Sequence, residues 1–245
     1  MKSRTGKFFR KTAASLLKRY YISTSGGYSI GSAYGGRFVL DWRHSLDKKV
    51  ALELYEHDQI SYLFSLLDRI NARIFLDVGS HAGLYSIITK ARYPGMEVHA
   101  FEPDRTNLCQ LYANLFVNDM QTSVIVHEHG ISDHEGRVSF DTSDITSSRG
   151  TRRISSTGNI EIEIRRLDSV FDSRDNIIAL KIDVEGHECE AVEGANSLLT
   201  SNRCLLQVES APDKLERLRN KLTSLGYKHI GTVGDHYFTN MDFSV

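Results

Sequence analysis

The chain has 245 residues, of which 40% are apolar and 25% are charged, and its net charge is −1. This balance is ordinary for one large globular domain or a domain with an appendage. No apolar run in this sequence is long enough to cross a bilayer. The three scattered cysteines, Cys109, Cys189 and Cys204, fit buried thiols in the cytoplasm better than a disulfide framework.

The charge is distributed unevenly along the chain. Residues 1–40 contain eight basic residues and no acidic one, so the rest of the chain carries −9. Within residues 4–21, apolar side chains recur at helical spacing with basic residues between them, which predicts a helix with two different faces. Three interpretations remain open for this segment: a helix lying on the inner face of a membrane, a packed extension, or a transit peptide. We treat residues 1–37 as a basic amphipathic extension and residues 38–245 as the main domain.

The main domain alternates strands and helices. A Gly-rich stretch at 23–36 predicts turns or a hairpin, and residues 49–70 have the apolar spacing of one helix. The expected core strands are 74–78, 96–101, 124–128, 177–182 and 204–209, the expected helices are 83–91, 104–117, 190–199 and 213–225, and segments 227–232 and 236–239 are expected to close the chain as an antiparallel hairpin. Repeated strand–helix units predict an α/β fold with a mostly parallel sheet and helices on both faces.

One stretch interrupts the alternation of strands and helices. Residues 141–159 are polar, rich in Ser and Thr, and include Arg149, Arg152 and Arg153. A long polar excursion inside a compact domain indicates either a functional loop or a solvated hairpin tip. If it is functional, its arginines are suited to holding a polar or anionic substrate.

Polar residues cluster where the predicted strands end. In a parallel sheet these ends meet at one edge, where ligands bind. Glu102 ends the second strand, where a carboxylate can accept hydrogen bonds from the two hydroxyls of a ribose. The complete set of strand-end residues is Asp77, Gly79, Ser80, His81, Gly83, Glu102, Asp104, His129, Ser132, Asp133, Asp183, Glu185, His187, Glu188, Glu209 and Ser210.

The glycine spacing narrows the class of ligand. A dinucleotide site uses G-x-G-x-x-G, whose middle glycine clears a diphosphate. Here only Gly79 and Gly83 are present. Asp77 before the turn also disfavours an anion and favours a sulfonium or ammonium group. The pattern therefore indicates an adenosine ligand without phosphates, such as S-adenosylmethionine.

These motifs carry a resemblance to a known family. They are Asp77-x-Gly79-x-x-x-Gly83 followed by Tyr85-Ser86, then Phe101-Glu102-Pro103, then Leu-Lys-Ile-Asp-Val-Glu-Gly-His-Glu at 180–188. Together, over residues 38–240, they resemble the FkbM family of S-adenosylmethionine-dependent methyltransferases. The resemblance implies a Rossmann-like class I fold, a seven-stranded sheet with one antiparallel strand, and O-methylation of a sugar or polyketide hydroxyl.

The resemblance also implies roles for individual residues. Asp77, Gly79 and Gly83 would surround the methionine end of the cofactor, Glu102 would hold the ribose, and Ser132 with Asp133 would lie near the adenine. Ser80 stands where the family usually has Asn, which changes a local cofactor contact but not the fold. Asp183, Glu185 and His187 would face the methyl group and the acceptor.

Three residues are candidates for the base that removes the acceptor's proton: Asp183, His187 and Glu209. Neutral His accepts a proton near pH 7, whereas Asp183 is better placed at a strand end. The structural alternative is that Asp183 or Glu185 caps the next helix and supports the turn at Gly186. A divalent metal held by Asp183, Glu185 and His187 is the less favoured alternative, so we expect no metal.

The sequence therefore predicts an S-adenosylmethionine-dependent O-methyltransferase. Its acceptor would be a small molecule or a hydroxyl of a sugar, glycan or glycolipid, and fucose of a lipo-oligosaccharide signal is one specific hypothesis. A lipid-carried acceptor would suit membrane contact through residues 4–21. Two alternatives remain: an NAD-dependent oxidoreductase on a similar sheet, and a nucleic-acid methyltransferase. The acidic body of the chain argues against nucleic acid as a partner.

Overall fold

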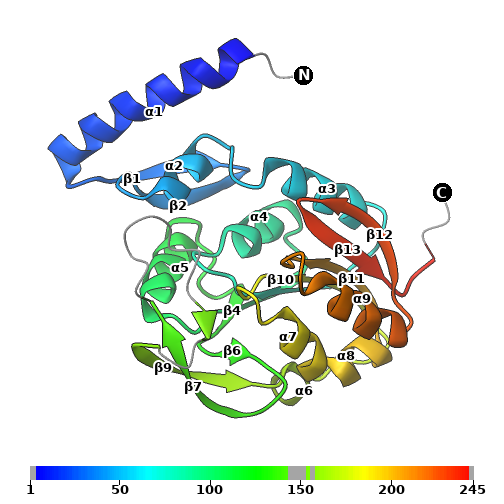
Figure 1. Ribbon diagram of the computed structural model, residues 1–245. Helices are drawn as coiled ribbons and strands as arrows, with labels where there is room; N and C mark the ends of the chain where they lie inside the picture. The colour runs from blue at the N-terminus through cyan, green and yellow to red at the C-terminus, as the bar shows by residue number, and fades with distance from the viewer. Residues whose placement is uncertain (1–3, 143–152, 155–157, 243–245) are drawn as a thin grey trace.

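A sheet of seven strands forms the centre of the molecule (Figure 1) in this computed structural model, which describes residues 4–142, 153–154 and 158–242. The strand order is β12-β13-β11-β10-β3-β4-β5. Pairing from β11 to β5 is parallel, whereas β13 runs antiparallel to both of its neighbours. The strands are β3 (Ile74–Val78), β4 (Glu97–Phe101), β5 (Val124–His127), β10 (Ile177–Ile182), β11 (Arg203–Val208), β12 (Lys228–Val233) and β13 (Asp235–Thr239). The mostly parallel seven-stranded sheet expected from the sequence is confirmed.

Helices cover both faces of this sheet. Alternate residues of β3 explain why: Phe75 joins one apolar cluster, while Ile74 and Leu76 join another on the opposite face. Strand β3 is buried along its whole length, as expected for a central parallel strand. One layer contains α3 (His57–Leu67), α4 (Leu84–Arg92) and α5 (Arg105–Val117), and the other contains α6 (Leu167–Val170), α7 (Glu188–Gly194), α8 (Asn196–Ser201) and α9 (Leu215–Ser224).

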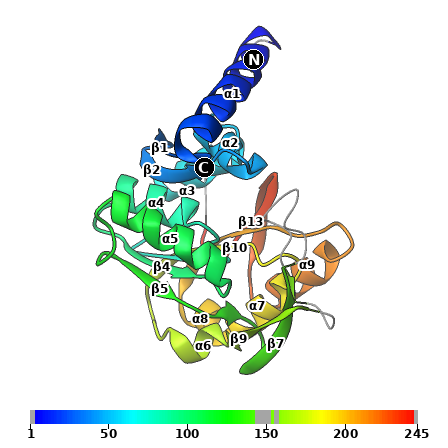
Figure 2. The same cartoon turned by 90° about the vertical axis from the view of Figure 1, so that its left-hand side faces the viewer.

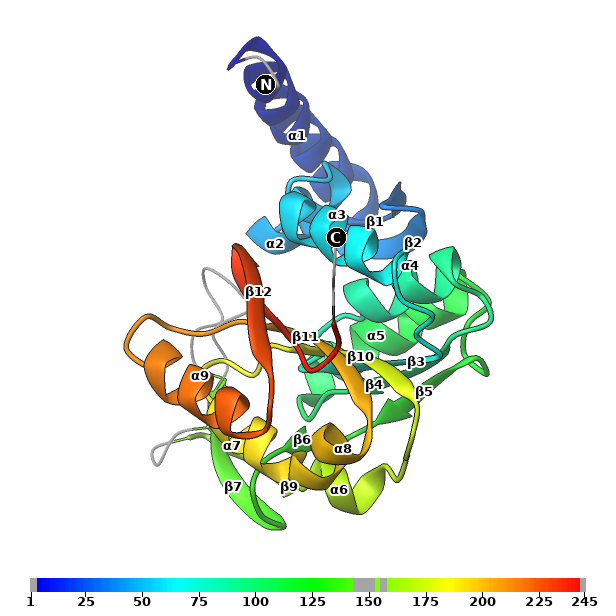
Figure 3. The same ribbon diagram turned by 90° about the vertical axis from the view of Figure 1, so that its right-hand side faces the viewer.

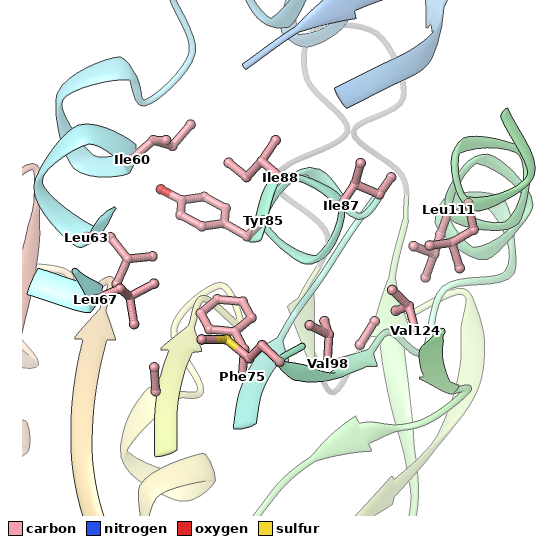
Figure 4. Close-up of a cluster of buried hydrophobic side chains, with 14 of the residues drawn as sticks. Ile60, Leu63, Leu67, Phe75, Tyr85, Ile87, Ile88, Val98, Leu111 and Val124 are labelled. Atoms are coloured by element: carbon pink, nitrogen blue, oxygen red, sulfur yellow. The ribbon is translucent and has the colours of Figure 1, made fainter. Parts of the chain in front are cut away.

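The first of these clusters lies between α3, α4, α5 and the sheet. Figure 4 shows Ile60 and Leu63 of α3 near Tyr85 of α4, with Phe75 and Val98 of the sheet below them. Every one of these side chains is buried. This packing fixes α4, and with it the turn between β3 and α4, against the sheet.

A second, four-stranded sheet has the order β6-β9-β7-β8. Its strands are β6 (Gly130–Ile131), β7 (Gly136–Asp141), β8 (Arg153–Ile154) and β9 (Ile160–Arg165). The apolar and β-branched runs Val138–Phe140 and Ile160–Ile164 in the sequence predict β7 and β9, whereas β6 and β8, at two residues each, are too short to show a period. Most of the polar excursion at 141–159, including Arg149 and Arg152, lies outside the described residues.

The chain before β3 forms an arm and a hairpin. Helix α1 (Arg4–Ser25) leads into β1 (Tyr28–Ala33) and β2 (Gly36–Asp41), followed by α2 (Ser45–Ala51). The hairpin is attached to α5, because the backbone N–H of Val39 donates to Oδ1 of Asn114 at 2.7 Å. The expected division between residues 37 and 38 falls inside β2, which pairs with β1 along its whole length.

Residues 49–70 do not form the single helix that we expected. The helical segments α2 and α3 are separated at Leu52–Glu56, where Glu53 and Glu56 adopt left-handed backbone angles of φ 51° and 46°. The Glu53 side chain accepts a hydrogen bond from the backbone N–H of Tyr34 at 2.8 Å. The apolar spacing continues across the break, so the periodicity could not reveal it. Correspondingly, residues 190–199 are divided into α7 and α8 at Ala195.

The state of the cysteines and the character of the helices can also be compared with the sequence. Cys189 and Cys204 are buried free thiols, as expected, but Cys109 is exposed. Within the described part of the chain, none of the helices combines the length and the apolar character needed to cross a membrane.

The turn between β3 and α4 depends on two glycines. Gly79 and Gly83 both have left-handed angles, φ 84° and 80°. A Cβ atom on Gly79 would lie 1.9 Å from the carbonyl oxygen of Asp183, and one on Gly83 would lie 2.3 Å from Cδ1 of Leu111. The turn therefore needs glycine for backbone angle and for close packing.

We expect Gly83→Ala to lower the free energy of unfolding by about 2–5 kcal/mol, the sum of left-handed strain and overpacking against Leu111. Urea unfolding followed by circular dichroism measures this. Gly95→Ala is the matched control, because no atom lies within 4 Å of its Cβ position and its φ is not left-handed. Equal midpoints for the two variants would contradict the packing argument.

Candidate active site

A pocket opens at the carboxyl ends of β3, β4 and β10. It contains about 1180 Å³ of empty space, part of it open to solvent. The hairpin, α2 and the segment before α3 form one wall, and Phe140, Ile154 and Ile162 of the second sheet form another. Its polar lining consists of Asp47, Glu56, Asp77, Ser80, His81, Glu102, Asn107, Gln110, Asn114, Lys181, Asp183, Glu185 and His187.

Asp77 organises the first turn of this pocket. Its Oδ2 accepts hydrogen bonds from the backbone N–H of Ser86 at 2.9 Å and from the Ser86 hydroxyl at 2.6 Å. Burial raises the pKa of Asp77 to about 6, although Lys181 and Ser86 act in the opposite direction. The carboxylate therefore occupies the start of α4, where a phosphate-binding turn would place its anion.

Glu102 is held at the end of β4 by three donors. Its Oε2 accepts from the backbone N–H of His81 at 2.9 Å. Its Oε1 accepts from the backbone N–H of Asp104 at 2.8 Å and from Nδ2 of Asn107 at 3.3 Å. Burial raises the pKa of Glu102 to about 7 despite these bonds. A carboxylate has about four acceptor positions, so one remains for a ligand hydroxyl.

The residues around Glu102 fit a nucleoside better than a diphosphate. The central residue of the turn is His81, with φ 51°. Its backbone N–H donates to the Glu102 side chain and is therefore not available to a phosphate group of a ligand. Among the described residues, the buried hydroxyl oxygen of Ser80 lines the pocket and has no hydrogen-bond partner. Because an unpaired buried hydroxyl is costly, a ligand group is expected to bond to it. These features match adenosine recognition without phosphates.

A buried ion pair lies at the end of β10. The Lys181 ammonium is 2.5 Å from Oδ2 of Asp183 and 4.7 Å from the centre of the Tyr85 ring. Lys181 is only 3% exposed. Burial alone would raise the pKa of Asp183, but Lys181, the hydrogen bond with Glu209 and the nearby His81 together outweigh it and lower that pKa to about 2. Asp183 is therefore an ionised carboxylate lining the pocket.

Glu209, at the end of β11, shares a hydrogen bond with Asp183. That bond, burial and the negative charge of Asp183 raise the pKa of Glu209 to about 9. Near pH 7 the pair therefore holds one proton between its two carboxyl groups. Glu209 is itself exposed and is not among the described residues that line the pocket.

The sequence assigned no role to several residues that complete this network. The Tyr85 hydroxyl donates to Oε2 of Glu56 at 2.7 Å, and Nε2 of Gln207 donates to the Tyr85 hydroxyl at 3.0 Å. Burial next to Glu56 raises the pKa of Tyr55 well above its usual value. A lysine within the apolar strand 177–182 was the available sequence signal, since lysine is rarely buried without a partner.

His187 lies on another side of the pocket. Its Nε2 is 2.9 Å from the hydroxyl oxygen of Ser132, and its Nδ1 is 3.6 Å from a carboxylate oxygen of Glu190. Burial lowers the pKa of His187, so the ring is neutral near pH 7. Ser132 is completely buried and, like Gly83, does not belong to the described pocket lining. Its predicted contact with the cofactor stays a prediction.

Glu188 supports the turn after β10, and the residue before α7, His187, makes no side-chain capping hydrogen bond. Glu188 accepts a hydrogen bond from the backbone N–H of Gly186 at 2.7 Å, and the Lys214 ammonium donates to the Gly186 carbonyl. Within the described residues, no group of three or more His, Cys, Asp or Glu side chains is arranged to hold a metal. The structure thus does not gather Asp183, Glu185 and His187 as a ligand set.

A mostly parallel seven-stranded sheet with one reversed strand and helices on both faces is a Rossmann-like α/β fold, and the pocket lies at the carboxyl ends of its strands, where such folds bind ligands. Residues 77–229 match the model of the methyltransferase FkbM domain. The chain belongs to the FkbM methyltransferase family, and the methyl donor of such a domain is S-adenosylmethionine.

Individual proteins resemble this chain at 20–30% identity over part of its length. The hexuronic acid methyltransferase AglP of Haloferax volcanii is 30% identical over 145 residues, which cover 57% of this chain and 57% of that protein. The methyltransferase sdnD of Sordaria araneosa is 22% identical over 186 residues, covering 62% of this chain and 72% of that one. The crystal structure of an FkbM methyltransferase from Methylobacillus flagellatus has a TM-score of 0.48 and 20% identity, covering 69% of this chain and 43% of that one.

Glu102 generates a pH-dependent prediction. With its pKa raised to about 7, the carboxyl group is protonated below that pH and ionised above it. Ribose hydroxyls donate best to the ionised form, so the affinity for S-adenosylmethionine should increase from pH 6 to pH 8. Glu102→Gln should cost roughly 2–3 kcal/mol of binding free energy at pH 8 and flatten this pH dependence.

Isothermal titration calorimetry at several pH values measures both effects. Glu128→Gln serves as the control, since Glu128 is not part of the described pocket lining and bonds to Tyr112. An unchanged pH slope in Glu102→Gln would assign the titration to another group.

Proposed function

We propose that this protein transfers a methyl group from S-adenosylmethionine to a hydroxyl group of a sugar, glycan or glycolipid. The observation that carries the proposal is the ionised Asp183 carboxylate in the pocket, held by buried Lys181. The named activity of AglP on hexuronic acid supports a sugar acceptor. Family membership decides against the NAD-dependent oxidoreductase alternative.

S-adenosylmethionine, when bound, supplies a methyl group that an oxygen nucleophile can attack. In this proposal Asp183 accepts a hydrogen bond from the acceptor hydroxyl and thereby orients it, which is the larger part of the benefit in a two-substrate reaction. A hydroxyl oxygen that is gaining a methyl group becomes strongly acidic. A carboxylate with a low pKa can therefore still accept its proton late in the reaction.

The neighbouring residues have distinct proposed roles. Lys181 is a positioning residue that keeps Asp183 ionised and fixed. Glu209 carries the proton of the shared pair, so it acts as a donor toward Asp183 rather than as the first base. His187 is neutral but bonded to Ser132, which makes it the second candidate for the base.

We place the protein in the cytoplasm, because its three cysteines are free thiols. A lipid-carried acceptor would bring it to the inner face of a membrane. Within the proposed acceptor class, a hexuronic acid and the fucose of a lipo-oligosaccharide are the specific compounds to test first.

The acceptor class can be tested by incubating the protein and trideuteromethyl-labelled S-adenosylmethionine with pools of free sugars, glycans and glycolipids. We expect mass spectrometry to show a labelled methyl ether on a sugar in at least one pool. Labelling confined to RNA or to protein substrates would overturn the proposal.

Asp183→Asn should lower kcat about 10²–10⁴-fold, the usual contribution of a positioned base. Binding of S-adenosylmethionine should persist, which calorimetry checks and which also shows that the variant is folded. Asp172→Asn is the matched control, since the Asp172 side chain is 90% exposed. Comparable activity of the two variants would transfer the base role to His187, and His187→Gln would then be the decisive substitution.

A further inference from the structure

Helix α1 presents apolar side chains to solvent. Leu16 is 63% exposed, Tyr20 is 59% exposed and Leu17 is 38% exposed. Helical geometry places these three residues on one side of α1, and we call them the apolar face of α1. Large apolar side chains grouped in this way usually mark a surface that binds something.

The attachment of α1 to the protein leaves this face exposed. Tyr21 lies at the edge of this face, one turn after Leu17, and stacks on Trp42, with ring centres 5.3 Å apart. Gly27 donates a backbone hydrogen bond to the Tyr21 carbonyl, and Trp42 donates one to the Gly27 carbonyl, each at 2.8 Å. In Figures 1, 2 and 3, α1 extends from the hairpin away from the sheet.

The charge of α1 identifies the kind of surface that would cover it. The range Arg4–Ser25 contains six basic residues, Arg4, Lys7, Arg10, Lys11, Lys18 and Arg19, and no acidic residue. A second copy of α1 would bring like charges together, which disfavours self-association. Nucleic acid would match the charge but not the apolar face. An anionic lipid surface matches both features.

We propose that α1 docks the protein on an anionic phospholipid surface, lying in the plane of the membrane. Leu16, Leu17 and Tyr20 enter the boundary between headgroups and acyl chains, while Lys18 and Arg19 contact lipid phosphates. The pocket is carried on the hairpin side of the protein, so docking would bring it near the membrane without any spanning segment. This inference is independent of the proposed acceptor.

The test is flotation of the full chain with vesicles of phosphatidylcholine alone or with about one third phosphatidylglycerol, at low and high salt. We expect binding to the anionic vesicles, weakened by salt. Leu16→Ser/Tyr20→Ser and Lys18→Glu/Arg19→Glu should each weaken binding at least about tenfold. Phe116→Ser is the matched control, because Phe116 is 69% exposed on α5, and it should bind like the wild type.

Calorimetry with S-adenosylmethionine shows that each variant is folded and separates this test from that of the enzymatic activity. Equal binding to both kinds of vesicle, or wild-type binding by Leu16→Ser/Tyr20→Ser, would overturn the proposal. A dimer that Leu16→Ser/Tyr20→Ser converts to a monomer, without vesicle binding by the wild type, would assign the face to a second copy. Tight RNA binding that is retained by Leu16→Ser/Tyr20→Ser would assign α1 to nucleic-acid binding.

Discussion

The buried ion pair between Lys181 and Asp183 is the interaction on which the site depends. A charged lysine inside a protein is tolerated only with a close counter-ion and further polar neighbours. The structure supplies Asp183 at 2.5 Å, the Tyr85 ring at 4.7 Å, and the negative charges of Glu56 and Asp235. These groups come from the central sheet, from α4 and from the chain before α3. The buried charge of Lys181 thus connects the central sheet, α4 and the segment before α3 around the pocket.

The close approach of β3 and β10 makes this arrangement possible. Gly79 lies so near the Asp183 carbonyl that no side chain fits between them, and the backbone N–H of Asp183 bonds to the Val78 carbonyl at 2.9 Å. The turn between β3 and α4 and the start of the segment that carries the Asp183 carboxylate are therefore fixed to each other through the backbone. This rigidity would matter for the proposed methyl transfer, because small displacements strongly reduce the benefit of proximity.

The sequence predicted the central sheet well because each strand there is a short apolar run between turn signals. Strands 74–78 and 177–182 were located to the residue. It missed the break at Leu52–Glu56, where side-chain bonds from distant residues override a continuous apolar spacing. It also placed Glu102 and Asp183 at one edge, but could not show that Glu102 is already bonded to His81, or that Asp183 and Glu209 share a proton. Such facts depend on distances between strands, which periodicity does not contain.

The pocket is lined by two separate parts of the chain, one within the family match and one ahead of it. The family match begins at residue 77 and includes Asp77, Glu102 and Asp183. The opposite wall of the pocket comes from Phe38–Glu56, ahead of that match. In the proposed site, donor binding would be built from the part of the chain that matches the family, and acceptor choice would depend on the hairpin, α2 and Glu56. Because α1 is anchored to the same hairpin through Tyr21 and Trp42, the segment that shapes the acceptor wall also holds the arm that would reach a membrane. Acceptor choice and membrane contact would therefore be set by one contiguous piece of chain.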